Sequence, residues 1–271
     1  MLYLVSTPIG NLADFSYRAV TLLKTCDYIL CEDTRHSRYL LEHYQIQVPL
    51  KSFHKFNESK TEDPIIEDLK SGKTIAMISD AGTPLISDPG QELVSRCRME
   101  GIQVSAIPGA CAVIDALVLS GLPATPFQFI GFLPKKEKEL QTVLSQALLY
   151  PGTTIAYETP HRIEETLSTM HQLSPERKLC VARELTKMHE ECLSGPAEEL
   201  IKKFQAHRPR GEMVLLISPP QESISYEHLS LQELVEMLQK DLHLSKQDAI
   251  KMAAQIRGLP KRDVYKLFTN D

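Results

Sequence analysis

Short apolar runs alternate with stretches of helical periodicity through the first half of the chain. Four apolar runs are expected to be strands, at 2–6, 28–32, 74–79 and 102–107. Apolar residues recur at helical spacing at 17–26, 37–44, 90–100 and 110–120. Because nearly continuous apolar runs are typical of strands buried on both faces, the alternation predicts an open, doubly wound parallel sheet. Such sheets bind ligands beyond the carboxyl ends of their strands.

A boundary is expected at GLPATPF (121–127), where two prolines and a glycine fall within seven residues. Beyond it, strands are expected at 129–132, 153–158, 178–184, 188–195 and 211–218. Helices are expected at 135–149, after Pro160 and at 197–206. This succession predicts a second α/β domain with a mixed sheet.

The tail of the chain has the pattern of three short helices. It begins at Leu229, after a stretch at 219–228 whose composition indicates a linker. Gly258 ends the second helical segment, and Pro260 stands where the first turn of a helix tolerates proline. We therefore expect two α/β domains at 1–121 and 122–220, followed by a helix-turn-helix-like module at 229–271.

The composition is that of a folded cytoplasmic protein. Apolar residues make up 42% of the 271 positions and charged residues 24%, which is ordinary globular composition. No apolar run approaches the roughly 20 residues of a membrane-spanning helix, and the N-terminus lacks the basic start of a secretory signal. Six scattered cysteines without a CxxC pair indicate core thiols in a reducing compartment.

Charge is unevenly distributed along the chain. The net charge of −5 argues against a protein that coats nucleic acid through bulk electrostatics. Between Lys246 and Lys266, however, six basic residues are accompanied by only two acidic ones. This local excess indicates either a patch that touches RNA or a solvated helix face.

Five loops of the first domain are rich in Gly, Pro, Asp and Thr. Four of them, at 7–14, 32–38, 79–90 and 107–113, follow the expected strands, and the fifth, at 53–59, follows a short run that ends near Phe53. Because the carboxyl ends of parallel strands meet at one edge of a sheet, the loops predict a site there, and Gly10, Gly82 and Gly109 would let the backbone approach a ligand closely. No loop matches GxGxxG or GxxxxGK[ST], and no spacing indicates a metal site.

Eight motifs in a fixed order carry a resemblance to a known family. They are STPIGNLAD, CEDTRHS, HKFNE, SDAGTPLISDPG, IPGACA, YETPHR, ARELTK and GEMVLLI. This order, and above all the twelve-residue SDAGTPLISDPG, resembles the tetrapyrrole methylase superfamily and, within it, the branch that methylates small-subunit ribosomal RNA. Ala110 and Cys111 depart from the family pattern, which often has a proline in this loop.

The resemblance implies a fold, a cofactor and a substrate. The fold would be a Rossmann-like domain followed by a second α/β domain, with S-adenosylmethionine in the cleft between them and no metal. The cofactor-binding residues carried over with the motifs are Pro8, Gly10, Asp80, Gly82, Thr83, Gly109, Cys111, Ala112, Tyr157, Glu184 and Met213. The substrate would be a cytidine ribose in the decoding region of small-subunit ribosomal RNA, methylated on its 2′-hydroxyl, and the enzyme would be a homodimer.

A ribose hydroxyl is a weak nucleophile at neutral pH, so a general base is expected beside it. Glu32, Asp33 and His54 lie on loops at the expected site edge and are the candidates, although the two acids would serve equally well to cap the following helix. The residues expected to bind RNA phosphate are Arg35, Arg38, Arg162, Lys261 and Arg262. For Arg162, a structural role at the start of a helix is the alternative.

Two further questions stay open at the level of sequence. Phe53, Phe56 and Tyr39 either stack on bases or pack in the core. Three rival functions also remain: a corrin C-methyltransferase of the same superfamily, an RNA-binding module without catalysis, and a nucleotide hydrolase. The basic tail argues against the first and the missing phosphate loop against the third, while binding of the cofactor would exclude the second.

Overall fold

The computed structural model describes residues 1–207, 209–221, 229–242 and 244–268, and the chain divides into two compact units. The first unit comprises Met1–Asp115 and Leu185–Glu190, and the second comprises Ala116–Glu184 and Glu191–Asp271. The chain thus leaves the first unit at Asp115, ahead of the boundary expected at 121, and returns to it for one short segment. The C-terminal helices belong to the second unit.

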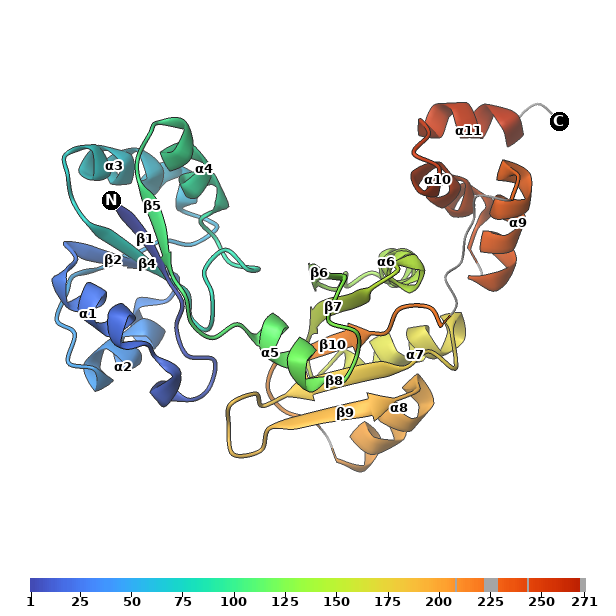
Figure 1. Cartoon of the computed structure of the whole chain (residues 1–271), viewed down its shortest axis with the longest axis horizontal. Coiled ribbons are helices and arrows are strands. Elements are labelled where there is room, and N and C mark those ends of the chain that lie inside the picture. Colours follow the sequence, from blue (N-terminus) through green and yellow to red (C-terminus); the bar gives the residue numbers. More distant parts are fainter. Residues whose placement is uncertain (208, 222–228, 243, 269–271) are drawn as a thin grey trace. The chain divides into compact units, whose positions relative to one another are not determined.

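The first unit contains a parallel sheet with the strand order β3-β2-β4-β1-β5 (Figure 1). The strands are β1 (Leu2–Val5), β2 (Tyr28–Cys31), β3 (Leu50–Ser52), β4 (Ile75–Ile78) and β5 (Val104–Ile107). In the central strand β4, Ile75 and Met77 pack on one face of the sheet, while Ala76 and Ile78 pack on the other. Burial on both faces explains why this strand is apolar throughout.

Helices cover both faces of the parallel sheet. They are α1 (Tyr17–Thr25), α2 (Thr34–His43), α3 (Glu58–Lys70) and α4 (Gln91–Met99), with the 3-10 turn η1 (Leu12–Asp14) before α1. Helix α5 (Ala112–Leu119) follows β5, and from Ala116 on it belongs to the second unit. Leu23 of α1 and Leu41 of α2 pack on one face, whereas Ile66 of α3 and Leu93 of α4 pack on the other. The helices that follow the neighbouring strands β1 and β4 therefore lie on opposite faces, which makes the carboxyl ends of these strands a topological switch point.

Helix α3 lies in a stretch to which the sequence analysis assigns no element, and it contains Pro64. Proline has no N–H to donate to the preceding turn, and its ring crowds the carbonyl four residues earlier. The helix forms nevertheless, since Ile65, Ile66 and Leu69 are buried against the sheet. Tertiary packing overrides the local propensity here.

The second unit contains a mixed sheet with the order β6-β7-β10-β8-β9. Its strands are β6 (Phe127–Phe132), β7 (Thr153–Glu158), β8 (Leu179–Arg183), β9 (Glu191–Gly195) and β10 (Met213–Ile217). β6 runs parallel to β7, while β10 is antiparallel to β7 and β8, and β9 is antiparallel to β8. The predicted fold class, a parallel sheet and a mixed sheet followed by a helical tail, is confirmed.

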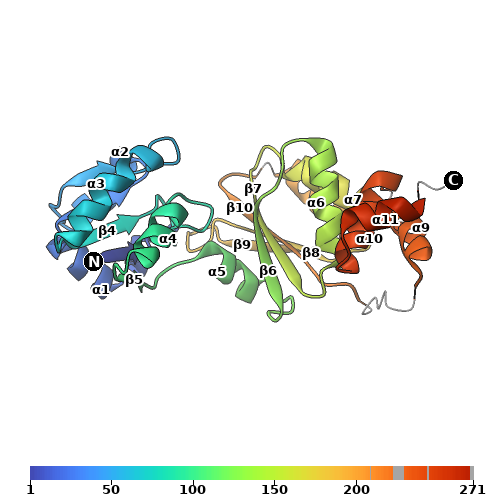
Figure 2. The same cartoon turned by 90° about the horizontal axis from the view of Figure 1, so that it is seen from above.

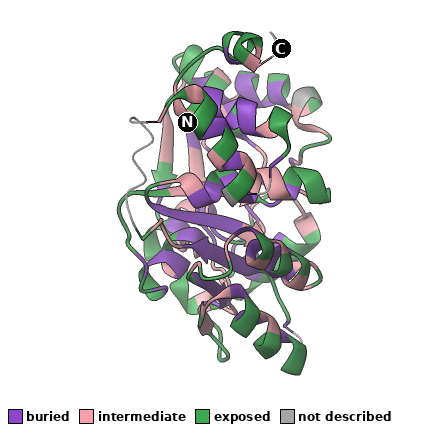
Figure 3. Cartoon of the chain, turned by 90° about the vertical axis from the view of Figure 1, so that its right-hand side faces the viewer, coloured by how far each residue is buried: buried purple, intermediate pink, exposed green. Residues whose placement is uncertain are grey.

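The three C-terminal helices share the hydrophobic core of the second unit. The helices of this unit are α6 (Glu137–Leu149), α7 (Ile163–Leu173), α8 (Ala197–Ala206), α9 (Leu231–Asp241), α10 (Lys246–Ile256) and α11 (Lys261–Phe268). Leu234 of α9 and Ile250 of α10 belong to the same buried cluster as Leu144 of α6, and Gln146 donates a hydrogen bond to Gln255 Oε1 at 3.2 Å (Figure 2). Buried residues gather in the central strands, such as β4 and β10, and on the inner sides of the helices (Figure 3).

Parts of two predicted segments lie outside the described residues. These are 222–228 of the linker expected at 219–228, and 243 and 269–271 of the expected C-terminal module. Within the ranges that the structure describes, none of the helices has both the length and the apolar character needed to cross a membrane.

Candidate active site

The loops that follow β1, β4 and β5 are joined by hydrogen bonds at the carboxyl edge of the parallel sheet. The N–H of Thr7 donates to the carbonyl of Gly82 at 2.9 Å, and the N–H of Gly82 donates to the carbonyl of Thr7 at 3.1 Å. Ser6 Oγ and Thr83 Oγ1 lie 3.0 Å apart, and Thr83 Oγ1 lies 3.1 Å from the carbonyl oxygen of Ala110, to which it donates. Three loops that are distant in sequence thus hold one another.

The loops after β2 and β3 meet the same edge. Asp80, in the loop after β4, accepts a hydrogen bond from the N–H of Asp33 at 3.4 Å, and its carbonyl oxygen lies 3.1 Å from His36 Nε2. Ser52 Oγ, at the end of β3, donates to the carbonyl of Glu32 at 3.5 Å. All five loops that the sequence assigns to this edge are therefore brought together.

The loop after β4 has an unusual backbone. Gly82, Leu85, Ser87 and Gly90 have positive φ angles of 83°, 73°, 73° and 116°. Residues with a Cβ rarely adopt this region, and such strained positions concentrate at ligand-binding and active sites. Leu85 and Ser87 therefore point to a functional role for the motif SDAGTPLISDPG.

Glycine keeps the backbone of this edge open at two positions. A Cβ at Gly82 would lie 3.2 Å from Ile9 Cγ2, and one at Gly109 would lie 2.9 Å from Ser6 Cβ. Larger residues would therefore force these loops apart. With the Asp80 carboxylate and the Thr83 hydroxyl, the loops form a cradle of backbone and side-chain polar groups that suits a small polar cofactor.

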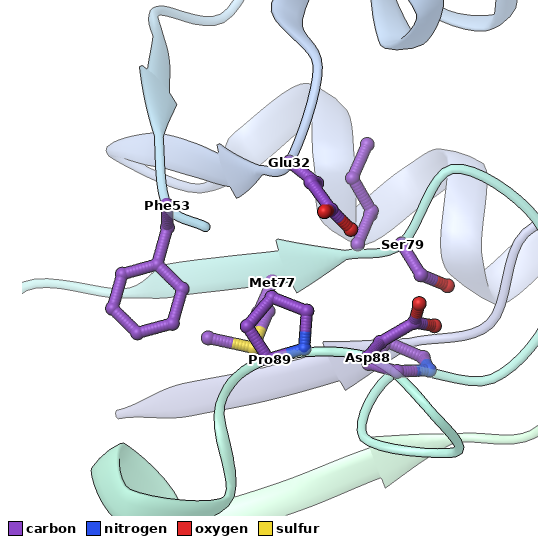
Figure 4. A pocket seen from close by; sticks show the side chains of 8 residues that line it. Glu32, Phe53, Met77, Ser79, Asp88 and Pro89 are labelled. Atoms are coloured by element: carbon purple, nitrogen blue, oxygen red, sulfur yellow. The ribbon is translucent and has the colours of Figure 1, made fainter. Parts of the chain in front are cut away.

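A small cavity at this edge is lined by two carboxylates. Its volume is about 10 Å³, room for a single water molecule, so it is too small to hold a cofactor or a nucleotide. The carboxyl groups of Glu32 and Asp88 and the hydroxyl of Ser79 point toward the same space (Figure 4). The sequence did not single out Asp88, although the repeated Ser-Asp pair in SDAGTPLISDPG was a signal for it. In the part of the chain that the structure describes, no group of three or more His, Cys, Asp or Glu could hold a metal ion.

Comparisons with known proteins identify the family to which this geometry belongs. The sequence model described as Tetrapyrrole (Corrin/Porphyrin) Methylases matches residues 1–201. Ribosomal RNA small subunit methyltransferase I of Halalkalibacterium halodurans is 42% identical over 271 residues, which cover 98% of this chain and 94% of that protein. The protein of the same name from Bacillus subtilis is 43% identical, over 99% of this chain and 94% of that protein. The one from Escherichia coli O157:H7 is 41% identical, over 98% of this chain and 93% of that protein. The chain belongs to the tetrapyrrole methylase family.

Solved structures of remote relatives agree with this fold. Diphthine synthase matches with a TM-score of 0.61 at 14% identity, over 80% of this chain and 89% of that one. Uroporphyrin-III C-methyltransferase of Thermus thermophilus, solved with S-adenyl homocysteine, matches with a TM-score of 0.55 at 15% identity. The match covers 80% of this chain and 96% of that one. As a tetrapyrrole methylase, the chain is a methyltransferase whose methyl donor is S-adenosylmethionine.

In this methylase, the cofactor residues expected in the first unit stand on three of the joined loops. They are Pro8 and Gly10 after β1, Asp80, Gly82 and Thr83 after β4, and Gly109 and Cys111 after β5, with Ala112 following as the first residue of α5. The segment Leu185–Glu190 adds a contact that the sequence did not predict. Lys187 Cγ lies 2.7 Å from the position of a Cβ on Gly10, so that only glycine fits beneath this side chain.

The cofactor residues expected in the second unit have different surroundings within that unit. Tyr157 is half-buried in β7. The centroid of its ring lies 4.9 Å from that of the Phe129 ring and 5.2 Å from that of the Phe132 ring. Glu184, just after β8, has a positive φ of 52°. Met213 is fully buried in the core, so its side chain is not accessible to a ligand. A role of these three residues in cofactor binding stays a prediction.

Asp33, one of the candidate bases, caps helix α2. Its Oδ1 accepts a hydrogen bond from the N–H of Arg35 at 2.8 Å, and its carboxylate pairs with the Arg35 guanidinium at 3.0 Å. Hydrogen bonds from the side chain and then the backbone of Arg35 lower the pKa of Asp33 to about 2. A carboxylate so strongly held in its charged form is a poor proton acceptor, which favours Glu32 and His54 as the base.

His54 is half-buried in the loop between β3 and α3. Its Nδ1 is buried and has no hydrogen-bond partner among the described residues. Buried polar atoms are nearly always hydrogen-bonded in folded proteins, so a buried ring nitrogen without a partner calls for an explanation. Because this atom is buried, it could take a proton from a substrate only after a shift of the loop, and the role of His54 as the base stays a prediction.

Most of the residues expected to bind phosphate are exposed. The Arg35 side chain is 89% exposed although it pairs with Asp33, and Arg38 is exposed on the same helix. Lys261 and Arg262 are exposed in the first turn of α11. These positions are compatible with contacts to RNA.

Arg162, by contrast, is engaged by its own unit. Its guanidinium donates to the carbonyl of Leu133 at 3.0 Å and to that of Pro134, and it lies 3.3 Å from the carboxylate of Glu158. Glu158 is fully buried and also accepts a hydrogen bond from Thr166 Oγ1 at 2.8 Å. Arg162 is thus the counter-ion of a buried carboxylate, the structural alternative to the phosphate contact.

Replacing Gly82 by valine is expected to abolish binding of S-adenosylmethionine, because the side chain would press against Ile9 and fill the cradle. Calorimetric titration of the purified variant measures this loss. Gly72→Val is the matched control. Gly72 also has a positive φ, 96°, but a Cβ there would have nothing within 4 Å. It lies in the turn before β4, at the opposite edge of the sheet from the cradle. Unchanged affinity in Gly82→Val would show that the cofactor binds elsewhere.

Replacing Arg162 by methionine is expected to lower the free energy of unfolding by about 3–5 kcal/mol, because Glu158 would be buried without a counter-ion. Urea denaturation measures the change, and adding Glu158→Gln should recover much of it. Arg38→Met on the exposed face of α2 is the control and should change stability by less than about 0.5 kcal/mol. If Arg162→Met is as stable as the parent but binds RNA less well, the phosphate role is correct instead.

Proposed function

We propose that this methylase transfers a methyl group to the 2′-hydroxyl of a cytidine ribose in the decoding region of small-subunit ribosomal RNA, in the cytoplasm and as a homodimer. The observation that carries the proposal is an identity of 41–43% with proteins named ribosomal RNA small subunit methyltransferase I, over 98–99% of this chain. This likeness includes the helical tail, which lies beyond residues 1–201 of the family match.

The reaction requires little covalent help from the protein. Bound S-adenosylmethionine supplies a methyl group on a positively charged sulfur. The chain must hold the acceptor hydroxyl in line with that group, exclude water and take up the hydroxyl proton. We assign the proton to His54 or Glu32, which stand on neighbouring loops. His54 has a ring nitrogen without a partner among the described residues, and Glu32 directs its carboxylate into the small cavity.

We assign cofactor binding to the cradle formed by the loops after β1, β4 and β5. Its open glycines and strained backbone are the supporting observations. Tyr157 and Glu184 are proposed as further contacts from the second unit. The positive φ of Glu184, rare for a residue with a side chain, is what singles out the end of β8.

Phosphate binding is assigned to two exposed sets of basic residues. Arg35 and Arg38 stand at the start of α2, beside the loops of the cradle, and Lys261 and Arg262 stand at the start of α11. A guanidinium matches the geometry of phosphate oxygens, and contacts of this kind hold RNA in place without reading its sequence. Because the net charge of the whole chain is −5, the attraction of RNA phosphates has to come from such local groups of basic residues.

A homodimer is supported by the surface of helix α5. Val118 and Leu119, in the part of this helix that belongs to the second unit, are 68% and 47% exposed. Apolar side chains gathered in this way are more often part of an interaction surface than of a surface facing solvent.

The decisive experiment is incubation of the enzyme with labelled S-adenosylmethionine and small ribosomal subunits, followed by mapping of the label. We expect one labelled cytidine, and we expect the RNA to resist alkaline cleavage after that nucleotide because its 2′-hydroxyl is blocked. Label in an alkali-sensitive position would place the methyl group on a base instead. Transfer to a corrin precursor, with none to RNA, would replace the proposal by tetrapyrrole methylation.

Changing Lys261 and Arg262 to glutamate is expected to raise the KM for small ribosomal subunits, and to reduce its salt dependence by about one unit of slope for each lost contact. Point variants are preferable to a truncation because α9, α10 and α11 contribute to the core of the second unit. The control is the double variant Lys24→Glu and Arg98→Glu, which alters exposed residues in the last turns of α1 and α4 and gives the same change in charge. Equal KM values in the two double variants would exclude α11 from the RNA contact.

A further inference from the structure

The structure separates the three aromatic residues whose role the sequence leaves open. Phe53 is in the core, with 2% of its surface exposed, whereas Tyr39 is 70% and Phe56 92% exposed. Phe56 stands in the loop between β3 and α3, three residues beyond the buried Phe53. A ring so exposed gives up the stabilisation that burial would bring, so the fold alone does not account for it.

The loop that carries this exposed ring is held in one conformation. Asn57 Oδ1 accepts a hydrogen bond from the N–H of His54 at 2.8 Å, and Asn57 Nδ2 donates to the carbonyl of Ser52 at 3.0 Å. At its far end, Glu58 Oε1 accepts from the N–H of Gly90 at 3.0 Å, which ties the loop to the strained segment after β4. The ring is thus presented from a fixed backbone, so little ordering would be needed when a ligand binds.

The Phe56 ring meets a second aromatic ring, and exposed lysines stand near it in the chain. The His54 ring meets the Phe56 ring edge to face, with centroids 6.1 Å apart and 65° between the planes. Lys55 and Lys60, on either side in the chain, are exposed. An exposed aromatic ring beside cations is the arrangement by which proteins hold single-stranded nucleic acid, the base stacking on the ring and the backbone phosphates meeting the charges.

We propose that Phe56 stacks on an unpaired base of the RNA substrate, beside the nucleotide that receives the methyl group. The inference rests on the proposed function, since it takes RNA as the substrate. The location fits, because Ser52 at the end of β3 pairs in register with Cys31, and Ser52 Oγ donates to the carbonyl of Glu32. In a duplex the bases already stack on one another, so this platform selects an unpaired segment at the acceptor.

The chain contains no tryptophan, so Phe56→Trp places a single indole on the platform. The full-length variant is titrated with a single-stranded RNA oligonucleotide and, separately, with a duplex of the same sequence. We expect the single strand to quench the indole fluorescence and the duplex to leave it nearly unchanged. Met99→Trp is the control, because Met99 is 77% exposed at the end of α4, away from the loops of the cradle, and its indole should not respond.

Substitutions at the same position separate stacking from other roles. Phe56→Ala should weaken binding of the single strand by about tenfold, the effect of losing one stacked base. It should also raise the KM for small ribosomal subunits, while the affinity for S-adenosylmethionine stays that of the parent. Phe56→Trp should bind like the parent, whereas Phe56→Leu, which keeps apolar bulk without a ring, should behave like Phe56→Ala.

Three results would contradict stacking on Phe56. The first is that Phe56→Ala or Phe56→Leu binds the single strand as tightly as the parent does. The others are that the single strand quenches the indole equally at positions 56 and 99, or that the duplex quenches the indole at position 56 as strongly as the single strand does. A different result would overturn the proposed function, namely a parent enzyme that does not methylate ribosomal subunits. In that case the oligonucleotide titrations would still decide whether Phe56 stacks on RNA bases.

Discussion

Two backbone hydrogen bonds between Thr7 and Gly82 hold together the loops after β1 and β4, at the point where α1 and α4 diverge to opposite faces of the sheet. Without them, each loop would leave backbone groups unpaired where Thr7 and Gly82 are buried. The bonds also bring Thr83 within reach of Ser6 and of the loop after β5, and Asp80 within reach of the loop after β2. The cradle therefore depends on one contact between residues about seventy positions apart.

This dependence explains which features can be predicted from sequence. The strands and the five loops are encoded locally: β4 is apolar throughout because both of its faces are buried, and its loop carries glycines at positive φ. Parallel strands with crossover helices place those loops at one edge without further information. The position of the site, though not its contacts, therefore follows from the local pattern of the chain alone.

Features set by distant contacts are not encoded in this way. Helix α3 contains Pro64, and only its packing against the sheet maintains it. Phe53 and Phe56 look alike in sequence, yet one is buried and the other exposed, because Phe53 follows β3 directly. Arg162 resembles a phosphate ligand until the burial of Glu158 is known, and Lys187 is seen to belong to the first unit only when the chain is folded. For α3 and Lys187 the deciding contact lies outside the local pattern, whereas Arg162 and Glu158 belong to one short motif, and it is the burial of Glu158 that the pattern does not give.

The net charge of −5 does not describe each part of the surface that RNA would meet, because acids and bases are paired with one another in some regions and not in others. Asp68 pairs with Lys51 and Lys73, and Arg96 pairs with Asp63 and Glu100.

Around the loop between β3 and α3 the balance differs. Lys55 and Lys60 form no ion pair within the described residues, and they flank the exposed Phe56 in the chain. Since screening by salt limits the range of exposed charges to about 10 Å, a phosphate at this edge would respond to these cations, and to the carboxylates of Glu58 and Glu62 close to them, rather than to the net charge. At this edge the two lysines meet at least as many acids, so binding of RNA there would depend on stacking against Phe56 more than on charge.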